Sequence, residues 1–188
     1  MPRIFVAIDP GPDARAELSR LLDDLRHAIP TVRWATAEQL HLTLAFLGEI
    51  AEASLAAVHG ITQAVASAHT PFRLALGAAG AFGPERAPRV AWLGVTGDLP
   101  ALHALRADLA ARLATAGHTL DARPFSPHLT LARLGGAEGP QAVGALLSHQ
   151  VGAAPWMVGA LRVMQSETRP TGAVYTGLGD YPLVAQRK

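Results

Sequence analysis

The sequence contains no cysteine and only one lysine, Lys188, at its very end. Without cysteine the chain can form no disulfide, no thiolate metal site and no iron–sulfur cluster, and it has no thiol nucleophile. Without an internal lysine it has no Walker lysine for a nucleotide-binding loop and no lysyl adenylate, with which ATP-dependent ligases begin. Phosphate recognition is therefore left to arginine, which supplies all the other basic residues.

Net charge and long apolar runs are also scarce. The 188 residues carry a formal charge of +1, which argues against a grip on duplex nucleic acid through many phosphates. The composition still allows a local cluster of arginines that binds one or two phosphates. The first apolar run, residues 4–8, ends too early for a signal peptide, and residues 139–161 contain prolines and glycines that spoil a membrane span. We therefore expect a cytoplasmic protein without membrane contact.

Apolar residues recur at two spacings, which predict a mixture of helices and strands. The mixture lacks a strict alternation of strand and helix, which favours an α+β fold with antiparallel sheets. No linker divides the chain, so residues 1–188 are expected to form one domain. The glycine- and proline-rich residues 77–88 are predicted to form a surface loop, and Gly117 is placed to cap a helix. Helices are predicted over 18–29, 55–65, 102–113 and 140–147, and strands over 3–8, 41–47, 71–76, 89–95, 126–132, 156–165 and 173–178.

One pentapeptide, His-Leu-Thr-Leu-Ala, occurs twice, beginning at His41 and at His128. In a strand, residues two apart share a face, so His41 lies with Thr43 and His128 with Thr130, while the leucines between them face the core. A lone histidine in an apolar strand is usually structural. Packing, however, does not require the same polar residue twice in the same local frame. The repeat therefore favours a functional role for both histidines.

Two histidines and two threonines in one cleft suit in-line displacement at phosphorus. Such a reaction needs a base for the attacking oxygen, an acid for the leaving oxygen and donors for the oxygens between them. Histidine titrates near neutral pH, and threonine hydroxyls can donate hydrogen bonds to phosphate. Each predicted strand offers only one good metal ligand, so we predict neither a metal nor another cofactor.

The paired His-x-Thr motifs, with apolar flanks and most of a small domain between them, resemble those of the two-histidine phosphoesterases. Within that superfamily the chain is most similar to the bacterial RNA 2′,3′-cyclic phosphodiesterases, also called 2′-5′ RNA ligases. The resemblance covers nearly the whole chain in the expected order. Its matching segments are residues 3–9, 40–48, 90–94, 123–133 and 175–178.

This resemblance implies a bilobal fold in which two pseudo-symmetric halves, each an antiparallel sheet flanked by helices, enclose a central cleft. It implies a monomer that opens 2′,3′-cyclic phosphates of RNA ends or small cyclic nucleotides to 2′-phosphates, and whose reverse reaction would form 2′-5′ linkages. The family pattern makes His41 the proton donor to the leaving 3′-oxygen and His128 the base on water. Because the two motifs are near equivalents, the sequence alone does not fix this polarity. Thr43 and Thr130 would hold the phosphate oxygens.

Two residues beyond the repeats have competing interpretations. Arg133 matches a family arginine that would contact phosphate, but strand alternation places it opposite His128, so this role requires the strand to end or twist. Phe46 could stack on a base, but alternation places it with the core leucines, which favours a core position. No site role is assigned to Tyr175, Arg86, Arg89, Arg123, Arg169 or Pro170, and His27, His59, His69, His103, His118 and His149 are interpreted as structural or solvated.

Two other functions compete with RNA-end hydrolysis. The first keeps the chemistry but changes the substrate to a small cyclic phosphate or a 2′-5′-linked oligonucleotide. The second is a binding module that recognises RNA ends without turnover. Catalysis predicts a bell-shaped dependence of rate on pH with limbs near the histidine range, whereas a binding module returns its ligand unchanged.

Overall fold

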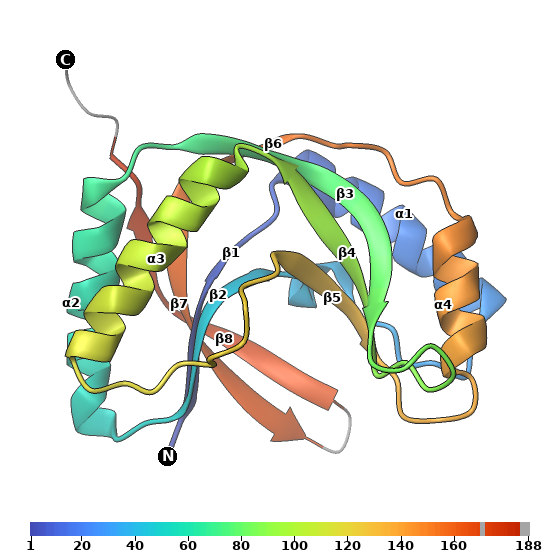
Figure 1. Ribbon diagram of the computed structural model, residues 1–188, viewed down its shortest axis with the longest axis horizontal. Helices are drawn as coiled ribbons and strands as arrows, with labels where there is room; N and C mark the ends of the chain where they lie inside the picture. Colours follow the sequence, from blue (N-terminus) through green and yellow to red (C-terminus); the bar gives the residue numbers. More distant parts are fainter. Residues whose placement is uncertain (170–171, 185–188) are drawn as a thin grey trace.

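Strands and helices follow one another irregularly along the chain, as Figure 1 shows. The computed structural model describes residues 1–169 and 172–184, so Pro170 and the single lysine, Lys188, lie outside the described residues. The helices are α1 (Pro12–Ala28), α2 (Glu52–Ala68), α3 (Leu99–Thr115) and α4 (Gly139–Ser148), with a 3₁₀ turn η1 (Ala37–Gln39). The strands are β1 (Arg3–Ile8), β2 (Leu42–Glu49), β3 (Phe72–Phe82), β4 (Val90–Gly97), β5 (His128–Arg133), β6 (Trp156–Val158), β7 (Ala160–Arg169) and β8 (Gly172–Pro182).

Local sequence explains where several helices begin and end. Pro12 occupies the first turn of α1, where its missing N–H costs nothing, and Pro30 follows the end of that helix. Helix α3 begins with the Asp98 side chain accepting a hydrogen bond from the Ala101 N–H. It ends at Thr115, and Gly117 follows the cap residue with a φ of +86° that favours glycine, as the sequence predicts.

All eight strands join one curled antiparallel sheet in the order β6-β3-β4-β5-β2-β1-β7-β8. Strands β6, β3, β4 and β5 make one half, and β2, β1, β7 and β8 make the other. The halves meet at a single registered pair, Leu42 with Leu129. The predicted α+β fold with two antiparallel halves is therefore confirmed, with the halves continuous as one sheet.

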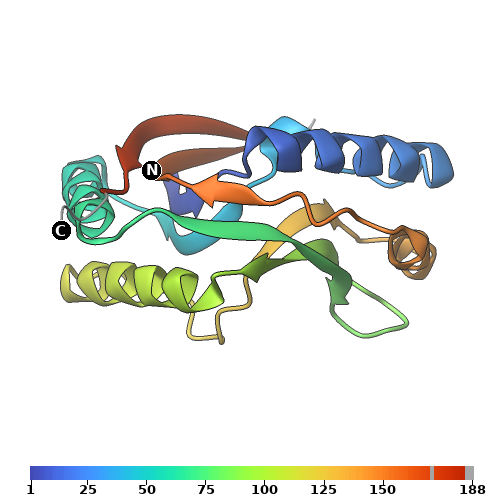
Figure 2. The same ribbon diagram turned by 90° about the horizontal axis from the view of Figure 1, so that it is seen from above.

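The two faces of the sheet have different surroundings. Helices α2 and α3 lie side by side at one end of the molecule, and α1 and α4 lie near each other at the opposite end (Figures 1 and 2). Along β1, Ile4, Val6 and Ile8 belong to the main core beneath the helices. The alternate residues Phe5 and Ala7 belong to a separate small cluster with Met164 and Tyr175. The histidines lie on the face of the sheet that carries this small cluster, opposite the main core.

Two predicted segments are wrong, and two others are too short: α1 begins six residues before the predicted start at 18, and β8 ends four residues after the predicted end at 178. Strand β3 continues to Phe82, so the first half of the segment predicted as a loop over 77–88 is strand. Glycine is required there because a Cβ at Gly80 would lie 2.4 Å from the Trp92 ring, so the residue that suggested a loop makes room for a neighbouring side chain. The strand predicted over 156–165 divides at Gly159 into β6, which pairs with β3, and β7, which pairs with β1.

No helix in the described part of the chain is both long and apolar enough to span a membrane.

Candidate active site

The two repeats lie at the centre of the sheet, on the adjacent strands β2 and β5. Leu42 and Leu129, the residues that follow the two histidines, pair across the junction and are almost fully buried. Because side chains alternate along a strand, the histidines before them and the threonines after them face away from the helix-covered core. The antiparallel junction thus places both His-x-Thr motifs on the same face of the sheet.

Each histidine ring is held by the same local hydrogen bond. The Nδ1 atom of His41 lies 2.8 Å from the carbonyl oxygen of Gln39, and that of His128 lies 2.7 Å from the carbonyl oxygen of Ser126. A carbonyl oxygen only accepts, so each Nδ1 carries a hydrogen and donates it. This fixes the tautomer and leaves Nε2 of each ring as the nitrogen that can take up or release a proton.

Aromatic side chains surround both rings in a similar way in the two halves. The ring of His41 lies 4.7 Å from Phe5 of β1 and 4.9 Å from Tyr175 of β8, centroid to centroid. The ring of His128 lies 4.8 Å from Phe82 of β3 and 6.2 Å from Trp92 of β4. Each imidazole is therefore bounded by two aromatic rings from its own half of the sheet, which restrict its rotation.

Burial lowers the pKa of both histidines below the ordinary value, because a desolvated imidazole is less stable when charged. The hydrogen bond to the Gln39 carbonyl and the charge of Asp9 oppose this effect at His41, while the charges of Arg15 and His128 add to it. At His128 the Ser126 carbonyl opposes the effect, and the Arg133 charge adds to it. Charges of both signs thus act on His41, whereas the charge that acts on His128 is basic and favours its neutral form.

A pocket of about 630 Å³ opens beside the two strands. Its lining includes three of the predicted site residues of the repeats, Thr43, Thr130 and His128, together with Arg133. His41 is not among the lining residues, so the pocket brings together three of the four expected groups of the repeats; the His41 ring packs against Phe5 and Tyr175. The pocket is thus a site in which hydroxyl, imidazole and guanidinium groups converge.

A β-bulge within each repeat decides where the next residue points. Thr43 pairs with Ala7, but the next pairing is Ala45 with Val6, so Leu44 is an extra residue on β2. Leu44 and Ala45 are consequently both buried, and the alternation reverses beyond them. Phe46 therefore returns to the face of Thr43, where it is 44% exposed and lines the pocket. The favoured core position for Phe46 is wrong.

The same irregularity occurs in the second repeat. Thr130 pairs with Trp92 and Ala132 with Ala91, which leaves Leu131 as the extra residue on β5. Arg133 then returns to the face of Thr130 and lines the pocket. The reversal supplies the twist that a phosphate contact by Arg133 requires. Phe46 and Arg133 thus occupy equivalent positions in the two halves.

Several pocket residues carried no signal in the sequence. Arg3, Arg106 and Phe125 line the pocket from β1, from α3 and from the segment before β5. Arg123 also lines it, but its guanidinium forms hydrogen bonds to both carboxylate oxygens of Asp121. Of the other residues without an assigned role, Tyr175 packs on His41, Arg169 pairs with Glu167, and Arg86 and Arg89 are exposed and do not line the pocket.

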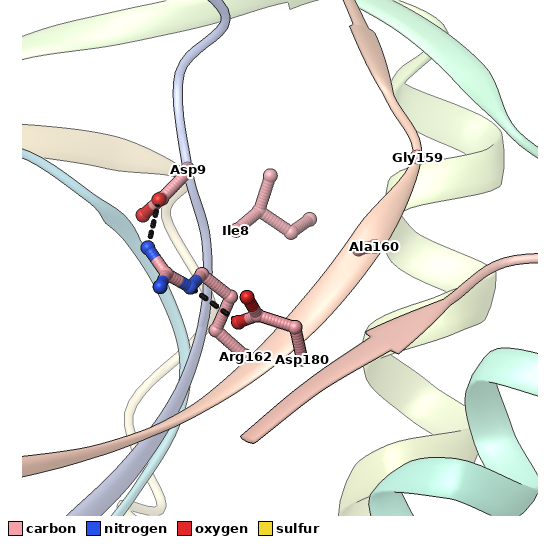
Figure 3. Close-up of a pocket in the computed structure, with 6 residues that line it drawn as sticks. All are labelled: Ile8, Asp9, Gly159, Ala160, Arg162 and Asp180. Atoms are coloured by element: carbon pink, nitrogen blue, oxygen red, sulfur yellow. Dashed lines mark hydrogen bonds and ion pairs between the residues drawn. The ribbon is translucent and has the colours of Figure 1, made fainter. Parts of the chain in front are cut away.

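A smaller pocket of about 310 Å³ lies next to β1, and Figure 3 shows its lining. Arg162 points between two carboxylates there, with Nε 2.6 Å from Asp180 and Nη1 bound to Asp9. Asp9 also pairs with Arg15 at 3.2 Å. Because these charges satisfy one another, this pocket offers fewer unpaired groups to a ligand than the larger one.

Among residues 1–169 and 172–184, no three histidine, aspartate or glutamate side chains gather closely enough to hold a metal ion.

A curled antiparallel sheet with two His-x-Thr motifs on its central strands defines a phosphoesterase of the two-histidine class. The chain belongs to the 2′-5′ RNA ligase superfamily, whose family model matches residues 10–170.

Two curated relatives of this chain have the same name. The chain is 38% identical over 136 residues to an RNA 2′,3′-cyclic phosphodiesterase of Geobacillus stearothermophilus, a match that covers 72% of this chain and 43% of the relative. The chain thus spans less than half the length of that relative. It is 32% identical over 188 residues to an RNA 2′,3′-cyclic phosphodiesterase of Thermus thermophilus, covering 96% of this chain and 90% of the relative.

Solved structures agree on the fold. The crystal structure of E. coli LigT complexed with NADP+ superposes with a TM-score of 0.76 at 28% identity, covering 97% of this chain and 99% of LigT. The crystal structure of a Thermus thermophilus protein superposes with a TM-score of 0.75 at 28% identity, covering 96% of this chain and 97% of the other.

Proposed function

We propose that this chain is a hydrolase that opens the 2′,3′-cyclic phosphate at an RNA end to a 2′-phosphate. The observation that carries the proposal is the pair of histidines on adjacent strands, each held through Nδ1 and free to exchange a proton through Nε2. The relatives' shared name, RNA 2′,3′-cyclic phosphodiesterase, supports the substrate. A neighbour solved with 3′-AMP, E. coli LigT, supports a pocket for nucleotides.

In the proposed mechanism His128 is the base and His41 the acid. Nε2 of His128 accepts a proton from water, whose oxygen attacks phosphorus, and the bond from phosphorus to the 3′-oxygen breaks. Nε2 of His41 gives its proton to that oxygen, and solvent then resets both rings. Burial lowers the pKa of both rings; of the nearby charges, Asp9 favours the charged form of His41 against the opposing charges of Arg15 and His128, and Arg133 favours the neutral form of His128 that a base requires.

The pocket offers donors for the charge that gathers on the phosphate. We place the Thr43 and Thr130 hydroxyls and the Arg133 guanidinium on its non-bridging oxygens. All three side chains line the pocket that His128 also lines. Donors fixed in advance by two strands stabilise the transition state without having to reorganise when charge develops.

The reverse reaction would join a cyclic-phosphate end to a 5′-hydroxyl through a 2′-5′ bond. The chain has no internal lysine for adenylation, so such a joining step draws on the energy of the strained cyclic phosphate itself. We include in the proposal that residues 1–188 act as one two-lobed domain, as a monomer and in the cytoplasm; size-exclusion chromatography with light scattering checks the oligomeric state.

Product analysis tests the function directly. A short oligoribonucleotide with a terminal 2′,3′-cyclic phosphate is incubated with the protein in EDTA, and the products are separated by chromatography beside authentic standards. We expect one product, with a 2′-phosphate. A 3′-phosphate would reverse the leaving group, and unchanged RNA after long incubation would identify a binding module instead. Turnover of small cyclic phosphates alone would favour the second enzymatic function.

A further inference from the structure

The end of the pocket next to α3 contains an arginine and a phenylalanine that the proposed chemistry does not use. The guanidinium carbon of Arg106 lies 5.3 Å from the ring centroid of Phe125, and both residues line the pocket. The same helix contributes His103, whose ring meets Phe125 edge to face at 5.7 Å. Two residues of one helix thus fix the position of the Phe125 ring.

Among the described residues Arg106 forms no ion pair of its own, although its charge contributes to lowering the pKa of nearby Asp121. Its Nε is buried and has no hydrogen-bond acceptor within the described residues. The carboxylate that lines the same pocket, Asp121, is engaged by Arg123 through both of its oxygens. Arg112 of the same helix, by contrast, pairs with Asp108 at 2.7 Å. Because the Asp121 carboxylate is bound to Arg123, an anion that enters the pocket would be attracted to the Arg106 guanidinium, which has no carboxylate bound to it among the described residues.

The half of the sheet that contains β1 and β2 contributes a second pair of an arginine and a phenylalanine. The guanidinium carbon of Arg3 lies 5.5 Å from the ring centroid of Phe46, and these residues also line the pocket. Single-stranded RNA is recognised by stacking of its bases on aromatic rings and guanidinium planes, and by arginine contacts to its phosphates. The pocket therefore holds two such platforms, one from β1 and β2 and one from α3 and the segment before β5.

Charge and size both exceed what one cyclic phosphate needs. The lining contains Arg3, Arg106, Arg123 and Arg133 but only one carboxylate, Asp121, so its formal charge is four minus one, or +3. The whole chain carries +1, so positive charge is concentrated here. A volume of about 630 Å³ exceeds that of a single phosphate contact site and falls in the range of small-ligand pockets.

We propose that Arg106 and Phe125 form a subsite for the nucleotide adjacent to the cyclic end. The Arg106 guanidinium binds the phosphodiester between the last two nucleotides, and the Phe125 ring supports the neighbouring base. The substrate is accordingly the end of a single-stranded oligonucleotide rather than a mononucleoside cyclic phosphate. This inference rests on the proposed function of the same pocket and adds the class of substrate.

The test compares two substrates, adenosine 2′,3′-cyclic phosphate and the dinucleotide ApA with a terminal 2′,3′-cyclic phosphate. For the wild-type chain we expect a higher kcat/KM on the dinucleotide. In Arg106→Gln the ratio of the two kcat/KM values should fall about 10-fold or more, the effect of losing a charged hydrogen bond. The matched control is Arg112→Gln, on the same helix but paired outside the pocket, which should keep the wild-type ratio.

Salt dependence supplies a second readout. Each phosphate contact to a single strand contributes about 0.7 to the slope of log binding against log salt. For the dinucleotide, the slope of log kcat/KM in Arg106→Gln should therefore be smaller by about that amount. Circular dichroism on heating shows whether the variant is folded.

Different results in these assays would overturn the subsite and the proposed function separately. An unchanged ratio in Arg106→Gln, or equal losses on both substrates, would overturn the subsite. If the wild-type chain hydrolysed neither substrate, the proposed function would fail by itself. Binding of ApA with a terminal 3′-phosphate, weakened in Arg106→Gln but not in Arg112→Gln, would then still support the subsite, and equal binding would overturn it.

Discussion

The assignment of His41 as acid and His128 as base predicts that the two histidines respond differently to the leaving group. We choose His41→Asn and His128→Asn because the asparagine amide can still donate to the Gln39 or Ser126 carbonyl that holds Nδ1. The substitution removes Nε2, the only ring nitrogen that the structure leaves for proton transfer. Each variant should therefore lose catalysis while keeping the local strand geometry.

The size of the loss follows from the role of that nitrogen. General acid or base catalysis contributes about 10²- to 10⁴-fold, which corresponds to about 2.7–5.4 kcal/mol at 1.36 kcal/mol per tenfold change. On a 2′,3′-cyclic phosphate both steps are needed, because the 3′-alkoxide leaves poorly without a proton. Both variants should thus fall by at least about 10²-fold in kcat.

A substrate with a stable leaving anion separates the two roles. The 2′-(4-nitrophenyl phosphate) of 3′-deoxyadenosine releases nitrophenolate, which needs no proton and is measured by absorbance. On this substrate His41→Asn should recover to within about 10-fold of wild type, because no acid is required, while His128→Asn should stay about 10²-fold or more below it.

Other outcomes would refute the reasoning. Recovery of His128→Asn in place of His41→Asn would reverse the two roles. Wild-type turnover of the cyclic phosphate by either variant would show that the two-histidine mechanism is wrong. Equal, unrecovered losses with both substrates would mean that the histidines position the phosphate rather than transfer protons.

Three further predictions concern the pocket around these histidines. Because burial lowers the pKa of both histidine rings, kcat/KM of the wild-type chain should be highest below pH 6.5, the unshifted pKa of histidine. Arg133→Gln removes a charge that lowers the pKa of His128, so the acidic limb of the pH profile, which reports the base, should move to higher pH. Thr130→Val removes one donor to a charged phosphate and should lower kcat about 10- to 100-fold, while Thr96→Val, exposed on β4, should not; equal effects in steady-state assays would refute a donor role. Phe46→Ala should raise KM for nucleotides about 5-fold or more through lost base stacking, and an unchanged KM with a collapsed melting temperature would instead indicate a core residue.

The two His-Leu-Thr-Leu-Ala repeats show which features of the site follow from the local sequence. The face shared by a histidine and the threonine two residues later follows from the pleat of any strand, so the His-x-Thr pairs could be predicted without a structure. The identical repeat also indicated that both copies serve one purpose. Their adjacency at the Leu42–Leu129 junction agrees with that inference and with the single cleft that the family resemblance implies.

The boundaries of the outer strands, by contrast, could not be predicted from local sequence. Glycines over 77–82 suggest a loop, yet they lie in β3 because Gly80 accommodates the Trp92 ring of β4. Likewise, the mostly apolar residues 156–165 are predicted as one strand, but Gly159 divides them between two halves of the sheet. In both cases the deciding contact is with another strand, the next one along the chain for Gly80 and strands distant in sequence for the residues on either side of Gly159.

The amino-acid sequence alone shows which groups are available: two His-x-Thr repeats and arginine as the internal cation, with no thiol and no internal lysine. Only the tertiary structure decided what surrounds them. Phe46 and Arg133 reach the pocket because bulges at Leu44 and Leu131 reverse the strand alternation, and a bulge is defined by the register against a neighbouring strand. Alternation is a local property of the chain, whereas register is a property of pairs of strands, which is why the first could be predicted and the second could not.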